Sequence, residues 1–340
     1  MLCIGAGGIG CPALLYLAAA GVGKIGIIDH DSIDISNLNR QIIYTEQDCR
    51  KQKAEIAAQK ILALNNNINI NIYTHPLTSE NALNIIREYD VVIDGSDNYP
   101  TRYLANDAAF FAAKPVVSAS VYQFTGQLAV FNYKKGPCYR CLYPEPPDNN
   151  LIPNCNDSGV LGAVTGIMGS VAVLETIKLL VDFQTELNSS LIIFEALSLV
   201  MKKYPMPKKN HCILCSGHTS FSDLPRYSQV QCAVKNSQNA ISVNELVNKM
   251  QHEKILLIDV REKWEYAINS IPGSINIPLN KLSTITLNDF KNKPHDTIVL
   301  YCKSGIRSQS ALNSLLNAGF NSVFNLEGGI ENWLKTFSEI

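Results

Sequence analysis

The sequence predicts an α/β protein of two domains, the first built on a mostly parallel, Rossmann-like sheet. The chain opens on a short apolar run that ends in a glycine cluster, residues 1–10, and a helix-like apolar pattern follows. Further short apolar runs alternate with helical patterns up to about residue 194, as in a sheet with crossover helices. A new strand–helix pattern begins at Ile241, and 340 residues suit two ordinary domains.

The composition excludes several classes of protein. Hydrophobic residues make up 46% and charged residues 17%, which is enough apolar material for packed cores. The formal net charge of −1 favours neither nucleic-acid nor membrane-surface binding. Glu175 and Lys178 interrupt the apolar stretch 160–181, so a buried helix is predicted there rather than a membrane span.

The ten cysteines indicate a compartment as well as a chemistry. No secretion signal is recognised before the first predicted strand. In such a chain, cysteines are more often used for metal or thiol chemistry than for a disulfide framework. A cytoplasmic location is therefore expected.

The glycine cluster is typical of a phosphate-binding turn. Glycine allows the tight turn between strand and helix, and its missing side chain lets backbone N–H groups approach an anion. Asp29 ends the second predicted strand, residues 24–29, where an acidic residue can bond ribose hydroxyls. A turn or cap aspartate is the alternative. An NAD-dependent oxidoreductase would show the same pattern up to this point.

Two basic residues favour a triphosphate over a dinucleotide. Arg40 lies in a polar loop, residues 36–41, and Lys53 in the first half of a predicted helix over residues 50–64. Phosphoryl transfer needs its developing charge neutralised, whereas a dinucleotide has no particular need for both cations. Each residue alone could equally be a solvated surface charge.

Polar residues follow the predicted strand 90–94. Ligands of open α/β sheets bind beyond the carboxyl ends of the strands, which places Asp97 to hold Mg²⁺ or to meet the reacting phosphate. The alternative role is an N-cap for the helix that begins near Tyr99. Asp97 and Asn98 could also share these two roles.

Two C-x-x-C pairs predict a metal site. Cys138 and Cys141 form the first pair, and Cys212 and Cys215 the second. Together they can close a tetrahedral Cys₄ zinc site, which leaves no open position for substrate and so tethers the chain rather than catalyses. Unrelated buried cysteines or a redox pair are the alternatives.

Another cysteine, Cys155, lies in the loop between the two C-x-x-C pairs. Residues 144–157 are rich in Pro, Asn and Asp, and they contain Cys155 close to a predicted helix start. A thiol in this position would be accessible and easily ionised, although it could also be an idle loop cysteine.

The second domain, residues 240–340, follows a linker predicted at 217–239. Its strand 297–301 delivers a loop consisting of Cys302, Lys303, Ser304, Gly305, Ile306 and Arg307. Backbone N–H groups, the following helix and the two basic residues would favour a thiolate or persulfide at the cysteine. By mechanism alone, a phosphatase and a sulfurtransferase both fit this loop.

Several separated motifs in residues 1–216 resemble the ThiF/MoeB/E1 family. They are GAGGIGCP, IIDHD, SNLNRQ and DGSDN, with Lys53 in its place between them. The resemblance implies adenylylation of the C-terminal glycine of a ubiquitin-like protein. It implies that Gly8 contacts phosphate, Asp29 the ribose, and Asp97 with Asn98 the Mg–ATP and acyl-adenylate end. The remaining ATP contacts that it implies are Ser36, Asn37, Leu38, Asn39, Arg40 and Lys53. It also supports zinc at the cysteine pairs, and it gives Cys155 a role in attacking the carrier or resolving a sulfur-bridged intermediate.

The second domain resembles the rhodanese fold. DVREKWEY (259–266), IPGSINIP (271–278) and LEGGIENW (326–333) carry this likeness, and the six-residue loop from Cys302 to Arg307 has the sulfurtransferase length. The resemblance makes Cys302 the persulfide carrier. Asp259, Arg261, Glu262 and Glu327 are expected to form structural ion pairs.

The whole chain resembles fusions of an adenylyltransferase with a sulfurtransferase. The implied cofactors are ATP, Mg²⁺ and Zn²⁺. The implied partners are a small ubiquitin-like sulfur carrier with a Gly-Gly tail, a sulfur donor such as a cysteine desulfurase or thiosulfate, and a second copy in a homodimer. Relatives carry a further N-terminal segment whose arginine reaches the partner's ATP, and this chain is expected to lack it. A non-catalytic carrier-binding scaffold therefore stays as an alternative. An NAD-dependent oxidoreductase also stays, because it would explain the glycine turn and Asp29. Molybdopterin, thiamine, tRNA-thiolation and cysteine pathways all use proteins of this kind.

Overall fold

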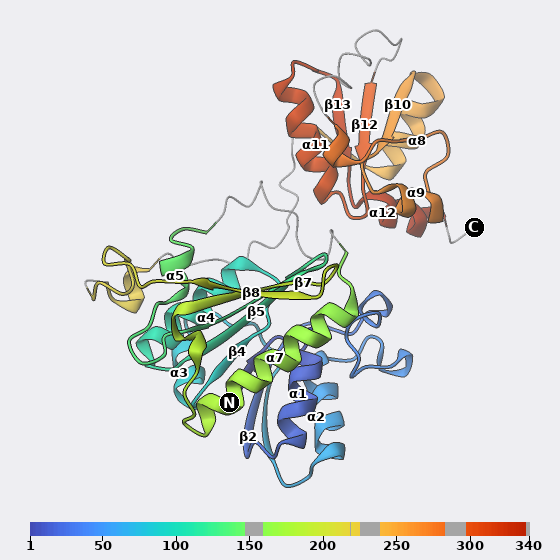
Figure 1. The fold of residues 1–340 in the computed structure, drawn as a ribbon. Helices are drawn as coiled ribbons and strands as arrows, with labels where there is room; N and C mark the ends of the chain where they lie inside the picture. The colour runs from blue at the N-terminus through green and yellow to red at the C-terminus, as the bar shows by residue number, and fades with distance from the viewer. Residues whose placement is uncertain (147–158, 218, 225–238, 283–296, 338–340) are drawn as a thin grey trace. The chain divides into compact units, whose positions relative to one another are not determined.

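The computed structural model describes residues 1–146, 159–217, 219–224, 239–282 and 297–337. Their contacts divide them into two compact units, one formed by the described residues up to 224 and the other by those from 239 onward. The two units are described separately below (Figure 1).

The first unit contains an eight-stranded sheet in the order β3-β2-β1-β4-β5-β6-β7-β8. The first five strands in this order, β3-β2-β1-β4-β5, are parallel, and β6, β7 and β8 extend the sheet as an antiparallel meander. The strands are β1 (Leu2–Ile4), β2 (Lys24–Ile28), β3 (Asn69–Tyr73), β4 (Val92–Asp94), β5 (Val116–Tyr122), β6 (Thr125–Phe131), β7 (Ser190–Glu195) and β8 (Val200–Pro205). The predicted mostly parallel sheet is confirmed, whereas β8 was not predicted, because its residues are all exposed and show no buried face.

Helices cover both faces of this sheet (Figure 1). One face packs on α1 (Gly10–Ala19), α2 (Lys53–Leu64) and α7 (Gly162–Leu180). The other packs on α3 (Ala82–Arg87) and α4 (Tyr99–Phe111). Cys3 on β1 belongs to the first core, while its neighbours Leu2 and Ile4 belong to the second, because successive strand residues point to opposite faces. The short pieces are α5 (Tyr139–Leu142), η1 (Ile35–Asn37), η2 (Glu46–Asp48), η3 (Glu186–Ser189) and η4 (Phe221–Asp223).

Helix α7 is long and apolar enough to cross a membrane by length and composition. It packs instead against α1 and against strands β5 and β6 of the sheet, and its buried residues include Val164, Met168 and Ala172. A core helix with these contacts passes the same test. The predicted helix is confirmed, and it is buried on one side, since 44% of its apolar window is buried.

The second unit is a smaller α/β sandwich around a five-stranded parallel sheet, ordered β11-β10-β12-β13-β9. Two separate hydrophobic clusters fill its two faces. The strands are β9 (Ala240–Ile241), β10 (Ile255–Asp259), β11 (Ile275–Asn276), β12 (Thr297–Tyr301) and β13 (Val323–Leu326). The helices are α8 (Val243–His252), α9 (Lys263–Ile268), η5 (Leu279–Lys281), α11 (Ile306–Asn317) and α12 (Gly329–Phe337).

The order of the large sheet determines where a ligand can bind. The chain runs outward from β1 through β2 to β3 and then returns to place β4 on the other side of β1. Such a switch point leaves a crevice at the carboxyl ends of the two neighbouring strands. Gly5 follows β1 there and Gly95 follows β4, and a Cβ on Gly5 would lie 3.2 Å from the carbonyl oxygen of Gly95. Only a residue without a side chain allows the two loops to approach this closely.

Candidate active sites and metal centre

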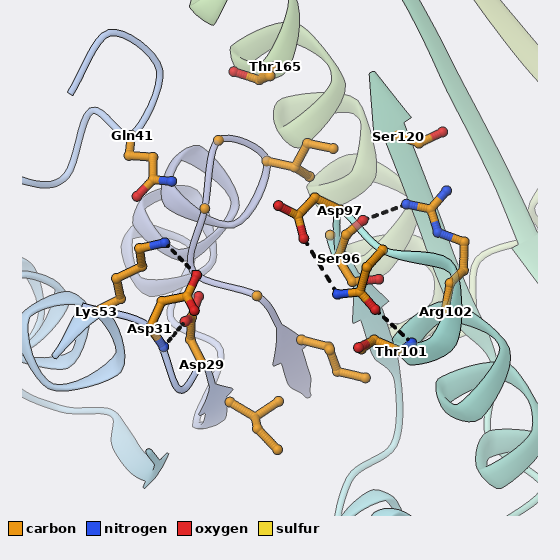
Figure 2. Close-up of a pocket in the computed structure, with 18 of the residues that line it drawn as sticks. Asp29, Asp31, Gln41, Lys53, Ser96, Asp97, Thr101, Arg102, Ser120 and Thr165 are labelled. Atoms are coloured by element: carbon orange, nitrogen blue, oxygen red, sulfur yellow. Dashed lines mark hydrogen bonds and ion pairs between the residues drawn. The ribbon is translucent and has the colours of Figure 1, made fainter. Parts of the chain in front are cut away.

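A pocket opens at this switch point, at the carboxyl ends of β1, β2 and β4 (Figure 2). Six of the predicted ATP-site residues line it, namely Gly8, Asp29, Arg40, Lys53, Asp97 and Asn98. These residues come from positions spread over about a quarter of the chain, and the sheet brings them together. The predicted residues Ser36, Asn37, Leu38 and Asn39 lie in and beside the adjoining turn η1 and do not line the pocket. Arg40 is held by this turn, because its Nη1 donates to Ser36 O at 3.2 Å and to Asn39 Oδ1 at 3.1 Å.

Two hydrogen bonds fix the glycine turn at Ala6, one made by its N–H and one by its carbonyl oxygen. The Ala6 N–H donates to Asp29 Oδ2 at 2.7 Å, and the Ala6 carbonyl accepts from the Tyr44 hydroxyl at 2.9 Å. The Tyr44 hydroxyl also lies 3.1 Å from the carbonyl oxygen of Lys53. Tyr44 therefore joins the phosphate turn to the first residue of α2.

One lysine and two aspartates are linked along one side of the pocket. Lys53 Nζ lies 2.9 Å from Asp31 Oδ2, and the Asp31 N–H donates to Asp29 Oδ1 at 2.9 Å (Figure 2). Burial raises the pKa of the Asp29 carboxyl, while Lys53 and the N–H groups of Asp31 and Ala6 oppose this rise. Both Asp29 oxygens thus accept a backbone N–H, and each keeps a second lone pair that a ribose hydroxyl could use.

Of the two residues that the sequence offered as a cap for α4, Asn98 takes that role and Asp97 does not. Asn98 is the N-cap of α4, because its Oδ1 accepts the Thr101 N–H at 2.9 Å. Asp97 is exposed at the pocket, and Asn98 Nδ2 lies 3.5 Å from its Oδ1. The N-cap alternative for Asp97 is therefore wrong, and its carboxylate stays on the ligand side of the loop.

Sequence reasoning missed Gln41, Tyr44, Arg102 and Thr165. Gln41 is buried, lines the pocket, and its Oε1 has no hydrogen-bond partner among the described residues. A Cβ on Gly8 would lie 3.2 Å from the Thr165 side chain, which closes the pocket from α7. Two of them left a sequence signal. Gln41 ends the SNLNRQ motif, and Arg102 follows the Asn98 cap by one helical turn and so shares its side of the helix.

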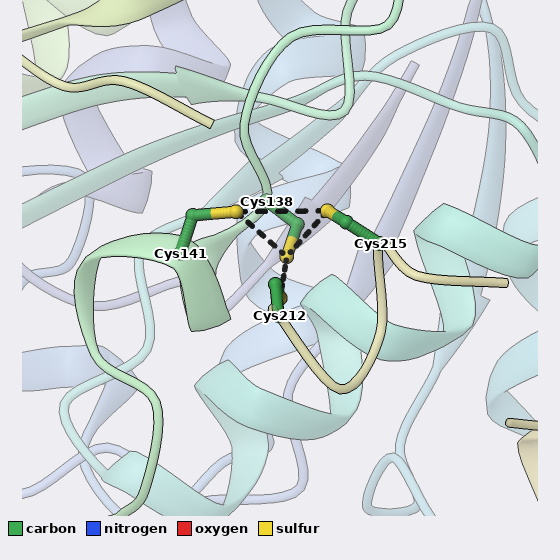
Figure 3. Close-up of side chains that lie close together, drawn as sticks. All are labelled: Cys138, Cys141, Cys212 and Cys215. Atoms are coloured by element: carbon green, nitrogen blue, oxygen red, sulfur yellow. Dashed lines mark hydrogen bonds between the residues drawn. The ribbon is translucent and has the colours of Figure 1, made fainter. Parts of the chain in front are cut away.

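The four predicted metal ligands meet in one cluster (Figure 3). The Sγ atoms of Cys138, Cys141, Cys212 and Cys215 all lie within 4.8 Å of one another. Four thiolates at about 2.3 Å from a tetrahedral Zn²⁺ stand about 3.8 Å apart. Four of the six Sγ–Sγ distances, 3.3–3.9 Å, are close to this value, so the cluster could hold a tetrahedral metal ion.

The cysteine cluster is attached to the helix that starts at the pocket. Arg140 lies between the first two cysteines in sequence, and its guanidinium forms a buried pair with Asp107 of α4, at 2.9 and 2.7 Å. The Tyr139 N–H donates to Asn106 Oδ1 at 2.8 Å. The far end of α4 is thus held by the cysteine turn, while its first residues line the pocket.

The second unit presents a cysteine loop at the end of β12. Cys302 is fully buried, and its Sγ accepts from the Gly305 N–H at 3.2 Å and from the Ser308 hydroxyl at 3.4 Å. Gly305 has φ +96°, and it caps the start of α11, whose N-terminus favours an anion. The loop therefore offers two donors to a sulfur anion.

The two basic residues of this loop are each paired. Arg307 makes two bonds to the Glu265 carboxylate, at 2.6 and 2.8 Å, and Lys303 Nζ lies 3.6 Å from Glu331 Oε1. The positive field expected from them is therefore offset by these carboxylates. Of the residues expected to form structural ion pairs, Asp259 and Arg261 pair at 2.7 Å. Among the described residues, neither Glu262, the N-cap residue of α9, nor Glu327 forms one. Cys155 lies outside the described residues.

Comparison with known proteins identifies two domains in this chain. The chain matches the ThiF family over residues 1–216 and the rhodanese-like domain over residues 242–336. The pocket and the Cys302 loop thus lie in two known domains, an adenylyltransferase-type domain and a rhodanese-like domain. Among solved structures, Escherichia coli MccB with ATP shares the fold, at a TM-score of 0.56 and 21% identity over 63% of this chain and 66% of that chain.

Curated relatives span almost the whole chain. "Adenylyltransferase and sulfurtransferase MOCS3" of Drosophila ananassae is 41% identical over 98% of this chain and 77% of its own length. The Arabidopsis thaliana protein of the same name is 37% identical over 98% of this chain and 78% of its own length. The chain therefore belongs to the ThiF family, within its MOCS3 adenylyltransferases and sulfurtransferases. The dehydrogenase alternative explained neither the cysteine pairs nor the Cys302 loop, and these relatives give it no support.

Proposed function

We propose that this enzyme adenylylates the C-terminal glycine of a ubiquitin-like sulfur carrier and then transfers sulfur to it. The observation that carries the proposal is the meeting of Gly8, Asp29, Lys53 and Asp97 in one pocket at the sheet's switch point. The four residues provide an anion-binding turn, a ribose acceptor, a cation and a metal-binding carboxylate. An adenylylation site needs each of these groups.

In this proposal the carrier's terminal carboxylate attacks the α-phosphate of ATP, and pyrophosphate leaves. Lys53 and Arg40 offset the negative charge that develops on the phosphates. Asp97 would hold Mg²⁺, which supplies further charge neutralisation when bound. The product is an acyl-adenylate at the carrier's C-terminal glycine.

Sulfur transfer is proposed to occur at Cys302. The terminal sulfur of its persulfide attacks the acyl carbon and AMP leaves, which gives an acyl disulfide. The Cys155 thiolate then attacks the Cys302 sulfur, so that the carrier departs as a thiocarboxylate and a Cys302–Cys155 disulfide remains for an external thiol to reduce. The Gly305 N–H and the Ser308 hydroxyl would stabilise the sulfur anion.

Further parts of the proposal follow from the sequence. Zn²⁺ would be held by the four clustered cysteines in a closed structural role. The domains would run over residues 1–216 and 240–340 with a linker at 217–239. The sulfur donor would be a cysteine desulfurase or thiosulfate, the enzyme would act as a homodimer, and it would work in the cytoplasm.

The test is ATP–pyrophosphate exchange by the full chain with a panel of carriers that end in Gly-Gly. Asp97→Ala is compared with Glu80→Ala, which removes an exposed carboxylate outside the pocket. We expect exchange that requires one carrier, vanishes with Asp97→Ala and persists with Glu80→Ala. Folded, zinc-loaded protein that binds a carrier but never exchanges pyrophosphate would instead identify a carrier-binding scaffold.

A further inference from the structure

A buried carboxylate lies directly beneath the loop that carries Asp97. Asp94 ends β4 and is 1% exposed. Its Oδ1 accepts the Ser96 N–H at 3.1 Å and the Ser96 hydroxyl at 2.5 Å. Its Oδ2 accepts the Ser118 hydroxyl at 3.1 Å and lies 3.4 Å from Arg102 Nε. A buried charge with these partners is a fixed point of the structure, because removing any partner is costly.

The guanidinium of Arg102 contacts the same loop from the other side. Its Nη2 donates to the carbonyl oxygen of Ser96 at 2.5 Å, and Figure 2 shows this contact beside Asp97. The Ser96 N–H is thus held by Asp94 and the Ser96 carbonyl by Arg102. The carbonyl of Ser96 shares a rigid peptide plane with the N–H of Asp97. Fixing that carbonyl therefore fixes the orientation of the Ser96–Asp97 peptide plane, and with it the position of Asp97 in the loop.

Arginine suits this position through its shape as well as its charge. Nε and Nη2 lie on one edge of a planar fork, so a single side chain pairs its charge with the Asp94 carboxylate at 3.4 Å and donates a hydrogen bond to the Ser96 carbonyl. The contact to Asp94 is an ion pair and not a hydrogen bond. A lysine ammonium is a point charge on a flexible stem and can keep this ion pair without keeping the directed bond to Ser96. Arg102 is 12% exposed at the side chain, so little solvent competes for these contacts.

We infer that Arg102 is a positioning residue for adenylylation, which holds the Gly95–Asn98 loop so that Asp97 faces the reacting phosphate. This inference rests on the proposed function and adds to it a residue that acts through Asp97. Arg102 sets the geometry of the chemical step, while the glycine turn, Asp29 and Lys53 bind ATP on the other side of the pocket.

The test compares Arg102→Lys with Ser118→Ala in the full chain. Both substitutions change a partner of Asp94, but only Arg102 also holds the Ser96 carbonyl. For each variant we measure the Kd of Mg–ATP, the exchange rate at saturating Mg–ATP and carrier, and the thermal midpoint. A displacement of about 1 Å at a reacting group costs roughly 100-fold in rate. We expect Arg102→Lys to lower the exchange rate about 10- to 100-fold while the Kd changes less than about 3-fold.

Ser118→Ala should lower the exchange rate much less than Arg102→Lys does, because the Ser96 carbonyl keeps its bond to Arg102. The inference is overturned if Arg102→Lys exchanges at the wild-type rate, or if its rate is no lower than that of Ser118→Ala. If the wild-type chain shows no ATP–pyrophosphate exchange with any carrier, this result counts against the proposed function instead. The two failures are therefore distinguishable.

Discussion

Lys53 Nζ lies 2.9 Å from Asp31 Oδ2, although the lysine side chain is 8% exposed and the aspartate 55%. The cation is therefore held in the pocket before any triphosphate arrives, with one carboxylate as its partner. A buried ammonium needs such a partner, because an isolated charge away from water is costly. An incoming phosphate can replace that carboxylate without moving the lysine far.

Replacing Lys53 by methionine should weaken ATP binding strongly. The side chain keeps its length and apolar stem, but the charge that meets the phosphates is lost. A desolvated charge-assisted contact is worth about 1.5–3 kcal/mol, so we expect the Kd of Mg–ATP to rise roughly 10- to 100-fold. Isothermal titration calorimetry measures this directly. Lys51→Met is the matched control, since Lys51 is 54% exposed and pairs with Asp48 outside the pocket. Equal Kd values for the two variants would contradict the role of Lys53.

Removing the Tyr44 hydroxyl should loosen the phosphate turn. Tyr44→Phe keeps the buried ring but deletes the bonds to the carbonyl oxygens of Ala6 and Lys53. A hydrogen bond of this kind contributes about 1 kcal/mol, so a roughly 3- to 10-fold rise in the Kd of Mg–ATP is expected. Tyr16→Phe, at an exposed position of α1, should leave the Kd unchanged. If both variants bind like the wild type, the turn does not depend on this hydroxyl.

The cysteine cluster should hold one zinc ion per chain. The hydrogen bond between Cys138 and Cys215, followed by burial, raises the pKa of the Cys138 thiol, whereas the same bond lowers the pKa of the Cys215 thiol. Metal binding requires all four sulfurs to be thiolates, and the bound cation offsets their charge. We expect Cys138→Ser to lose the zinc found by elemental analysis and to lower the thermal midpoint. Cys49→Ser lies outside the cluster and should keep both. If the wild-type chain is purified without bound zinc and a chelator does not change its stability, the metal site is refuted.

The pair of Glu265 and Arg307 should make the rhodanese-like unit acid-sensitive. Burial opposes ionisation, but the bonds from Arg307 and from the Glu262 N–H prevail and lower the pKa of the Glu265 carboxyl. A lowered pKa contributes stability above the unfolded value of about 4.3, and this contribution is lost as pH falls through the folded value. We therefore expect Glu265→Gln to cost about 1–3 kcal/mol at pH 7 and progressively less below about pH 4.

Urea unfolding followed by tryptophan fluorescence measures this effect in the full chain. Both tryptophans of the sequence, Trp264 and Trp333, lie in the rhodanese-like unit, so the signal reports on it selectively. Glu331→Gln is the control, because the Glu331 and Lys303 side chains are 48% and 41% exposed and their attraction is screened. If the difference in the free energy of unfolding between Glu265→Gln and the wild type stays constant with pH, the carboxylate charge contributes nothing to stability.

The two donors to Cys302 should matter for sulfur transfer and not for adenylylation. Ser308→Ala removes the hydroxyl that lies 3.4 Å from Cys302 Sγ. We expect its persulfide-dependent sulfur transfer to fall about 10-fold, while Cys302→Ala abolishes transfer and both variants keep ATP–pyrophosphate exchange. Mass spectrometry of the loaded wild type should find one added sulfur atom on the peptide with Cys302. Sulfur transfer by Cys302→Ala would exclude this cysteine as the carrier.

Local sequence determined the features in which neighbouring residues act together. The glycine turn follows its strand within a few residues, each cysteine pair is spaced for one metal, and Cys302 begins its own loop. Such motifs depend on backbone conformations that nearby residues set themselves, and for this reason they were predicted with their residues.

Tertiary structure decided which distant residues meet. The strand order brings Asp97 across the sheet to the glycine turn, and it brings Cys138 next to Cys212, 74 positions further along the chain. Contacts of this kind join Tyr44 to Ala6 and Arg102 to Ser96. Another pairs Arg307 with Glu265, which offsets the positive charge of the arginine. No local pattern encodes such contacts, because they arise from how strands are ordered and helices pack around a common core.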